Sequence, residues 1–507
     1  MATTTQVSPK IQGEKETTQH LATQTRIDID MSTKIPVLIF FGGSLVWLLA
    51  ATVFGVLASI KMHHPTFMAQ WGWLTFGRVR PAHLNLIAYG WTSQVGVAVT
   101  LWLFARIART RLRLPELLVV AAVIWNVAVL AGTIGILAGY STGVEWLEFP
   151  EFAPPLFTVA YAIIALSCLL TFANRQPGHL YVSMWYLFGA VFWFPWLYVT
   201  ANLLILFVPL QGVLQPMVNW WFGHNVLGLW LTPIGVAAAY YLIPKVLGRP
   251  IHSYYLSIVG FWALAFFYNS TGIHHLIGGP VPAWLITYSG VASFMMVIPV
   301  ATVALNHHMT MVGNFRILLY SPTLRFVVFG AMSYTLVSLQ GSLHSSRVVN
   351  EVTHFTHYTV AHAHLGVYAF FSMIMFGAMY YIVPRLTGRE WASARLIQIH
   401  FWSAAIGITL YWVSLTWAGV IQGMMMNDPE TPFSEIVKYT LPYLVGRSLI
   451  GMLMTVGHVA FAILFVKNIF GKGPERGDPT IFGPLGEYKQ IIEQAEKMSY
   501  TPEPKQA

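Results

Sequence analysis

The chain has 507 residues, of which 56% are hydrophobic and only 9% charged. This composition is typical of an integral membrane protein and leaves no room for a second soluble domain. The single cysteine, Cys168, excludes a disulfide, a thiolate-bridged dicopper centre and a covalently attached c-type heme, which needs a Cys-x-x-Cys-His motif.

Twelve apolar runs are long enough to cross a bilayer, and they predict an all-α integral membrane protein with twelve transmembrane helices. The runs cover residues 36–60, 82–106, 115–139, 154–173, 180–208, 217–243, 254–277, 281–306, 322–342, 357–384, 396–421 and 438–467. Residues 36–470 therefore form the membrane domain. The polar residues 1–35 and 471–507 are expected to be tails, the second with a short helix near Leu485–Lys497.

Charged residues are distributed unequally between the two sets of loops. Basic residues follow the even-numbered spans, beginning with Arg106, Arg109, Arg111 and Arg113, whereas the opposite loops include the acidic Glu145, Glu148 and Glu151. Because cytoplasmic loops are enriched in lysine and arginine, both termini are expected to face the cytoplasm. The net charge of +9 follows from this asymmetry and is not a sign of nucleic-acid binding.

The first notable histidine, His83, stands near the start of the second span, three residues after Arg80. An arginine at this depth is well placed to pair with heme propionates through charge-assisted hydrogen bonds. The histidine pairs His63–His64 and His307–His308 lie outside the predicted spans. We expect them in solvent-facing loops.

Three further histidines fall in the sixth and seventh spans. His224 lies a turn or two into the sixth span, and His274 and His275 are adjacent near the end of the seventh. Neighbouring residues on an α-helix diverge by about 100°, so these two can bind one ion only where the helix is distorted or ends. Gly272 makes such distortion plausible. Three imidazoles with an open coordination position suit copper, and would also suit zinc or iron.

The tenth span opens with His362 and His364, which are two residues apart. On an α-helix they point about 200° apart, so they cannot easily share one metal but can each reach a different one. A helix that gives an axial ligand to each of two hemes would have this spacing. The alternative is a pair of polar residues at a water-filled cavity, although intramembrane histidine is usually functional.

With these segments in view, the chain resembles the heme–copper oxidase superfamily, and in particular the catalytic subunit of cbb3-type cytochrome c oxidases. The similarity spans roughly residues 36–470. The matching stretches are Phe76-Gly-Arg-Val-Arg-Pro-Ala-His83, Trp220-Trp-Phe-Gly-His-Asn225, Leu256-Ser-Ile-Val-Gly-Phe-Trp262, Gly272-Ile-His-His-Leu276, Ala361-His-Ala-His364 and Ala418-Gly-Val-Ile-Gln-Gly423.

The resemblance implies the heme–copper oxidase subunit I fold, two b-type hemes and one copper ion. His83 and His364 match the axial ligands of a low-spin heme b, and His362 matches the proximal ligand of a high-spin heme. His224, His274 and His275 match the copper ligands. Tyr268 matches the tyrosine that this family joins covalently to the first copper-ligand histidine, here His224.

Other residues carry over by the same resemblance. Ser257, Tyr334 and Tyr268 match positions of a cytoplasmic proton path, for which ordinary interhelical hydrogen bonding is the alternative. Arg80, His354 and His357 are expected near heme propionates, with Glu148 helping a calcium ion to bridge them. The expected partners are c-type cytochrome subunits, cytochrome c as electron donor and dioxygen as substrate, in the bacterial inner membrane.

The chain departs from the family pattern at two places. Gln340 stands where a glutamate is usual, with Arg347 after it in place of a lysine, and Gly260 replaces a histidine. A neutral amide cannot take or give a proton, so a proton-loading role at Gln340 is in doubt.

Two other functions compete with the oxidase. A related nitric oxide reductase would need a glutamate four residues after His224, where this chain has Gly228. A twelve-span secondary transporter would show repeat symmetry, and has no need of six histidines in this arrangement. The sequence therefore favours dioxygen reduction by copper and heme.

Overall fold

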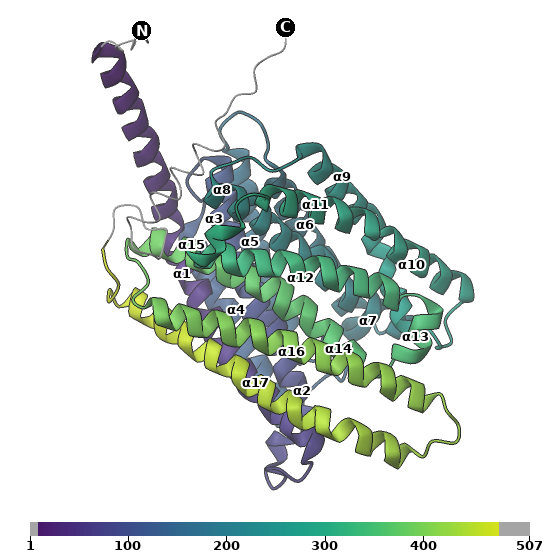
Figure 1. Ribbon diagram of the computed structural model, residues 1–507. Helices are drawn as coiled ribbons and strands as arrows, with labels where there is room; N and C mark the ends of the chain where they lie inside the picture. Colours follow the sequence, from purple (N-terminus) through teal and green to yellow (C-terminus); the bar gives the residue numbers. More distant parts are fainter. Residues whose placement is uncertain (1–8, 476–507) are drawn as a thin grey trace.

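The computed structural model describes residues 9–475, with side chains from Gln24 onwards. Over these residues it is a bundle of helices (Figure 1), and an isolated bridge between Arg389 and Glu475 is the one β-type pairing described. Twelve helical segments are long and apolar enough to cross a membrane, which confirms the predicted number. They are Gln24–His63, Phe76–Ala108, Pro115–Ala138, Ala153–Ala173, Val182–Phe207, Leu214–Leu247, Tyr254–Leu276, Ala283–Met311, Pro322–His344, His357–Thr387, Ala394–Met426 and Phe433–Ile469.

The first helix, α1 (Pro9–His63), corrects the predicted N-terminal boundary. The segment expected to be a separate tail up to residue 35 is helical from Pro9, and its first turns project beyond the rest of the bundle (Figure 1). Asp30 explains why the helix continues, because it accepts hydrogen bonds from Trp102 (3.0 Å) and Arg106 (3.2 Å) of the second span. The helix predicted at Leu485–Lys497 lies outside the described residues.

Besides the fifth span, which ends in the π-helical η3 (Leu203–Phe207), three spans contain a widened π-helical segment in their interior. The second consists of α2 (Phe76–Asn85), η2 (Leu86–Thr92) and α3 (Ser93–Ala108). The sixth consists of α7 (Leu214–Asn225), η4 (Val226–Leu231) and α8 (Thr232–Leu247). The tenth consists of α14 (His357–His364), η7 (Leu365–Ser372) and α15 (Met373–Thr387). In each case the π-segment directly follows the turn that carries a predicted histidine ligand, as π-bulges at functional sites often do.

The remaining helices surround these three spans. They are α4 (Pro115–Ala138), α5 (Ala153–Ala173), α6 (Val182–Asn202), α9 (Tyr254–Phe267), α10 (Ala283–Met295), α11 (Val297–Met311), α12 (Pro322–His344), α13 (Arg347–Thr353), α16 (Ala394–Met426) and α17 (Phe433–Ile469). Short segments complete the order: η1 (Gly72–Leu74), η3 (Leu203–Phe207), η5 (Tyr268–Leu276) and η6 (Phe315–Leu319). Helices α16 and α17 run side by side along one face (Figure 1).

Burial separates the central spans from the outer ones. The most apolar windows of the second, sixth and tenth spans are 89%, 83% and 89% buried, whereas those of the other nine are between 39% and 56% buried. A helix enclosed on all sides lies at the centre of a bundle. The spans that carry His83, His224, His362 and His364 are therefore the core of the molecule.

The placement of His307 and His308 corrects the sequence interpretation. Because α11 continues to Met311, both residues lie within the eighth span and not in a loop beyond it. His307 is buried, with 4% of its surface exposed, and only His308 is partly exposed.

Candidate metal centre

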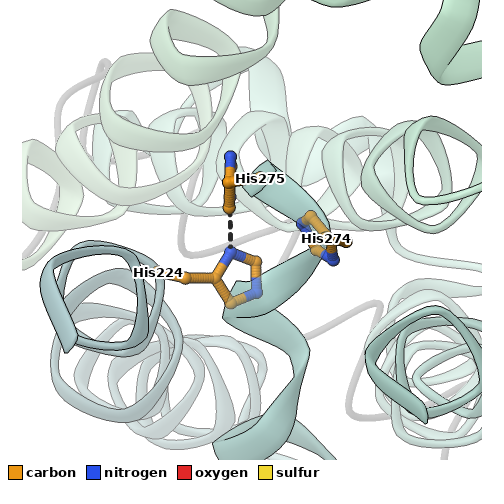
Figure 2. Close-up of side chains that lie close together, drawn as sticks. All are labelled: His224, His274 and His275. Atoms are coloured by element: carbon orange, nitrogen blue, oxygen red, sulfur yellow. Dashed lines mark hydrogen bonds between the residues drawn. The ribbon is translucent and has the colours of Figure 1, made fainter. Parts of the chain in front are cut away.

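Three histidines from two spans meet in the core (Figure 2). His224 comes from α7, and His274 and His275 come from η5. One ligand nitrogen from each lies within 4.8 Å of the others, and His224 Nδ1 is 3.0 Å from His275 Nε2. The seventh span tightens into a 3₁₀ helix from Tyr268 and ends at Leu276, which is the distortion that adjacent ligands need. No other such cluster of metal-binding side chains occurs among the described residues.

Neighbouring side chains hold two of these rings in place. His274 Nδ1 lies 2.8 Å from Ser293 Oγ, and the backbone N–H of His274 donates to Ser289 Oγ. The ring of His275 stacks on Trp220 with centroids 4.3 Å apart. Such partners orient a ligand histidine and set which ring nitrogen stays available. For His274 the available atom is Nε2.

Tyr268 packs directly against the triad. Its ring lies parallel to that of His224, with centroids 4.8 Å apart and planes 15° from parallel. It also covers Gly228 so closely that a Cβ atom at position 228 would overlap the phenol ring. The tyrosine thus occupies the space that a side chain at position 228 would need.

A second pair of histidines faces across the core between α2 and α14. The rings of His83 and His364 are 13° from parallel, with centroids 6.4 Å apart. A metal between two imidazoles, at about 2 Å from each nitrogen, would put the centroids roughly 6 Å apart. The distance therefore fits one metal bound by both rings.

Backbone carbonyls fix the orientation of this pair. His83 Nδ1 is 2.7 Å from the carbonyl oxygen of Ala51, and His364 Nδ1 is 2.9 Å from that of Val360. Each Nδ1–H therefore donates to a carbonyl, which leaves Nε2 of both rings as the basic nitrogen. Gly55 allows the close approach of His83, because a Cβ there would lie 2.7 Å from its ring.

His362 points elsewhere than His364, as their spacing predicts. Its ring approaches Gly341 of α12, and its Nδ1 is buried without a hydrogen-bond partner among the described residues. It interacts electrostatically with His224, His274 and His275. The structure thus brings His362 beside the triad and gives His364 to the separate pair with His83.

Comparison with known proteins agrees with this arrangement. Residues 35–453 match the family model described as cytochrome c and quinol oxidase polypeptide I. The chain belongs to the heme–copper oxidase family. It is 31% identical to the cbb3-type cytochrome c oxidase subunit CcoN1 of Stutzerimonas stutzeri, over 83% of this chain and 91% of the relative. It is 32% identical to a cytochrome c oxidase subunit 1 homolog of Azorhizobium caulinodans, over 82% of this chain and 78% of the relative.

The fold is that of solved heme–copper oxidases. A chain from the cryo-EM structure of a heme-copper terminal oxidase dimer superposes with a TM-score of 0.71, at 17% identity, over 92% of this chain and 90% of that chain. The family match over residues 35–453 excludes the secondary transporter. The chain is a heme–copper oxidase subunit I with cbb3-type relatives, and it is a multi-pass membrane protein.

In this heme–copper oxidase chain, Arg80, which the sequence predicts to bind heme propionates, lies next to two glutamates. Arg80 pairs with Glu145 and lies 3.8 Å from Glu148, whose Oε2 accepts a hydrogen bond from Asn85. Glu148 is buried in the loop before α5, and burial raises its pKa to about 7. His354, also outside the spans, is half-buried and stacks on Phe355.

Glu148 should make the stability of the oxidase chain depend on pH. Because the pKa is about 7 in the folded state and 4.5 in the unfolded reference, the folded protein binds more protons between these values. Glu148 therefore contributes on the order of 3 kcal/mol to the free energy of unfolding below about pH 4.5. This contribution is lost as the pH rises through 7. Thermal unfolding in detergent at pH 5 and pH 8 should show a smaller pH effect in Glu148→Gln than in the exposed control Glu151→Gln. Equal pH dependence in both variants would contradict this.

Ser257 and Tyr334, which are predicted to lie on the proton path, are both buried. Each also makes an ordinary packing or hydrogen-bonding contact. Ser257 Oγ donates to the carbonyl of Tyr254 in its own helix (2.6 Å), and Tyr334 packs on Phe370. Gln340 accepts a hydrogen bond from Trp412 (3.1 Å), while its Nε2 has no partner among the described residues. Gly260 faces Thr302 and Tyr186.

Two residues near the metal site were missed by the sequence interpretation. Arg447 of α17 lies over the ring of Tyr411 and interacts electrostatically with His364 and His83. An arginine inside the apolar run 438–467 was the available signal. His344, at the end of α12, lies 6.3 Å from His362 between ring centroids. Nothing in its local sequence distinguishes it, since only the packing of α12 on α14 brings it there.

An open apolar pocket is lined by residues of α7, η5 and α10. Its volume is about 320 Å³, and its lining includes Trp221, Asn269 and Ile273, which are close neighbours of His224 and His274 in the sequence. Leu214, Met217, Val218, Ser270 and Leu285 complete the lining. A cavity of this character suits a small apolar molecule.

Proposed function

We propose that the chain is the catalytic subunit of a cbb3-type terminal oxidase, which reduces dioxygen to water with electrons from cytochrome c and translocates protons. The observation that carries the proposal is the three-histidine cluster, with the ring of Tyr268 stacked on His224 and with His362 nearby.

The residues present fit two b-type hemes and one copper ion. His224, His274 and His275 would hold the copper, His362 the high-spin heme, and His83 with His364 the low-spin heme. The distance between the rings of His83 and His364 supports the last of these assignments. When bound, the high-spin heme and the copper would provide the place for dioxygen, and the two hemes and the copper would supply electrons.

The role of Tyr268 follows from the electron balance. Reduction of one dioxygen to two waters takes four electrons and four protons, and cleaving the O–O bond requires the electrons together. We assign to the Tyr268 phenol the supply of one electron and its hydroxyl proton. Its contact with His224 supports this role.

Arg80 and His354 would bind heme propionates, and Glu148 is the best placed carboxylate for a calcium ion beside them. Protons would reach Tyr268 past Ser257 and Tyr334 from the cytoplasm. The chain would lie in the bacterial inner membrane with both termini cytoplasmic, in a complex with c-type cytochrome subunits. The basic loops after the even-numbered spans support this orientation.

The environment of Gly228 favours an oxidase over a nitric oxide reductase. A glutamate four residues after His224 would need the space that the Tyr268 ring occupies.

Even Gly228→Ala should displace the phenol, cost about 1–3 kcal/mol of stability through overpacking and lower dioxygen reduction. Gly446→Ala on α17 is the matched control, because an added Cβ there meets nothing within 4 Å. Thermal unfolding and oxygen consumption measure both effects, and equal behaviour of the two variants would contradict the assignment.

The metal content of the purified complex tests the proposal. We expect one copper ion for every two noncovalent b-type hemes, with the c-type hemes of partner subunits counted separately, and oxygen consumption driven by reduced cytochrome c. Iron in excess of heme, without copper, would instead favour the nitric oxide reductase.

A further inference from the structure

His307 is a buried histidine that the site described above does not use. It lies on α11 one turn before the helix ends at Met311, and 4% of its surface is exposed. Both of its ring nitrogens, Nδ1 and Nε2, are buried without a hydrogen-bond partner among the described residues. The buried His400, by contrast, has one ring nitrogen bonded to the hydroxyl of Tyr380. A buried polar group without a partner costs about 1–3 kcal/mol, so its retention needs a reason.

The ring of His307 lies against a phenol. It meets Tyr240 of α8 edge to face, with centroids 4.5 Å apart. The hydroxyl of Tyr240 accepts a long hydrogen bond from Asn306 (3.4 Å), which also donates to the carbonyl of Ser253 at the start of α9. His307 is thus at the entrance of a polar cluster formed by α8, α9 and α11.

Tyr240 connects this cluster to the metal site through further phenols. The ring of Tyr186 lies 5.9 Å from that of Tyr240, and its hydroxyl is buried without a partner among the described residues. Tyr334 of α12 interacts electrostatically with Tyr186, Tyr240 and Tyr268. A series of ionisable side chains therefore leads from His307 to the tyrosine at the triad.

Gly260 of α9 faces the middle of this series. A Cβ at this position would lie 2.8 Å from Thr302 Oγ1 and 3.1 Å from the hydroxyl of Tyr186. The seventh span thus offers no side chain here that could carry a proton. The imidazole comes instead from the facing helix α11, between the basic loop after the eighth span and Tyr240.

We propose that His307 carries protons from the loop end of α11 towards Tyr240 and so to Tyr268. The proposal rests on the proposed oxidase function. One ring nitrogen takes a proton from water at the loop end, the other releases a proton towards the Tyr240 hydroxyl, and the ring returns to its neutral form without any redox change. The side chain that the structure places against the ring of His307 is Tyr240 on α8. His308 is next to it, and Arg249 at the helix end bonds to Val312.

The test uses the assembled complex in liposomes with reduced cytochrome c. His307→Phe keeps the ring packing on Tyr240 but cannot carry a proton, and His308→Phe, on the same helix, is the control. We expect oxygen consumption by His307→Phe to fall at least about tenfold with unchanged heme and copper content. The solvent isotope effect on the remaining rate should rise. The control should keep its rate.

A second variant covers the case in which His307→Phe assembles poorly. His307→Gln stays polar but cannot be protonated at neutral pH, so it should lose the same activity and show the same rise in the solvent isotope effect. A His307→Gln rate within about twofold of the unaltered complex, or a loss without a change in the isotope effect, would make His307 a packing residue and overturn the proposal. If the unaltered complex itself consumes no oxygen, the proposed function fails and not this inference.

Discussion

Replacing His275 with alanine should remove the copper ion and abolish oxygen reduction while both hemes stay in place. His275 supplies one of three imidazoles that converge in the core, and its Nε2 lies 3.0 Å from His224 Nδ1. Loss of even an outer partner of a metal ligand costs about 10–100-fold in metal affinity, so loss of a ligand should cost more. Elemental analysis and the reduced heme spectrum measure the two contents.

The exposed His179, in the loop before α6, gives the control variant His179→Ala. It should retain copper, hemes and turnover. Full copper occupancy in His275→Ala would contradict the assignment of the triad. Loss of copper together with both hemes would instead mean that the variant is misfolded, and His275→Gln, which is closer in volume and still polar, would then repeat the measurement.

Replacing His364 with alanine should remove the low-spin heme alone. The parallel rings of His83 and His364, with centroids 6.4 Å apart, would hold one heme between them, whereas His362 lies near the triad. Electrons from cytochrome c would then have no low-spin heme to enter through. Turnover should fall by more than the 10–100-fold expected when a residue that only supports a metal ligand is lost. The heme count should fall from two to one with copper retained.

The neighbouring variant His362→Ala provides the matched comparison, because it lies two residues away on the same short helix, α14. It should lose the high-spin heme and keep the low-spin spectrum. If both variants lost the same heme, the assignment of His362 and His364 to two different hemes would be wrong.

Much of this architecture could be predicted from local sequence. The twelve spans follow from apolar runs, since backbone groups in lipid must be satisfied within a helix. The opposite directions of His362 and His364 follow from helical geometry, and adjacent His274 and His275 required a helix that tightens or ends near Gly272. Helix ends were less predictable: α1 begins before residue 35 and α11 continues past residue 306, and the contacts of Asp30 with Trp102 and of His307 with Tyr240 lie in these added turns.

The sequence by itself determined the membrane class, the number of spans and the six candidate ligands, because composition, apolar length and residue type are local properties. Only the tertiary structure decided which rings meet, that Tyr268 fills the space at Gly228, and that Arg447, His344 and His307 lie near the site or its approach. These facts depend on how distant helices pack against one another. No local pattern encodes such a contact between residues far apart in the chain.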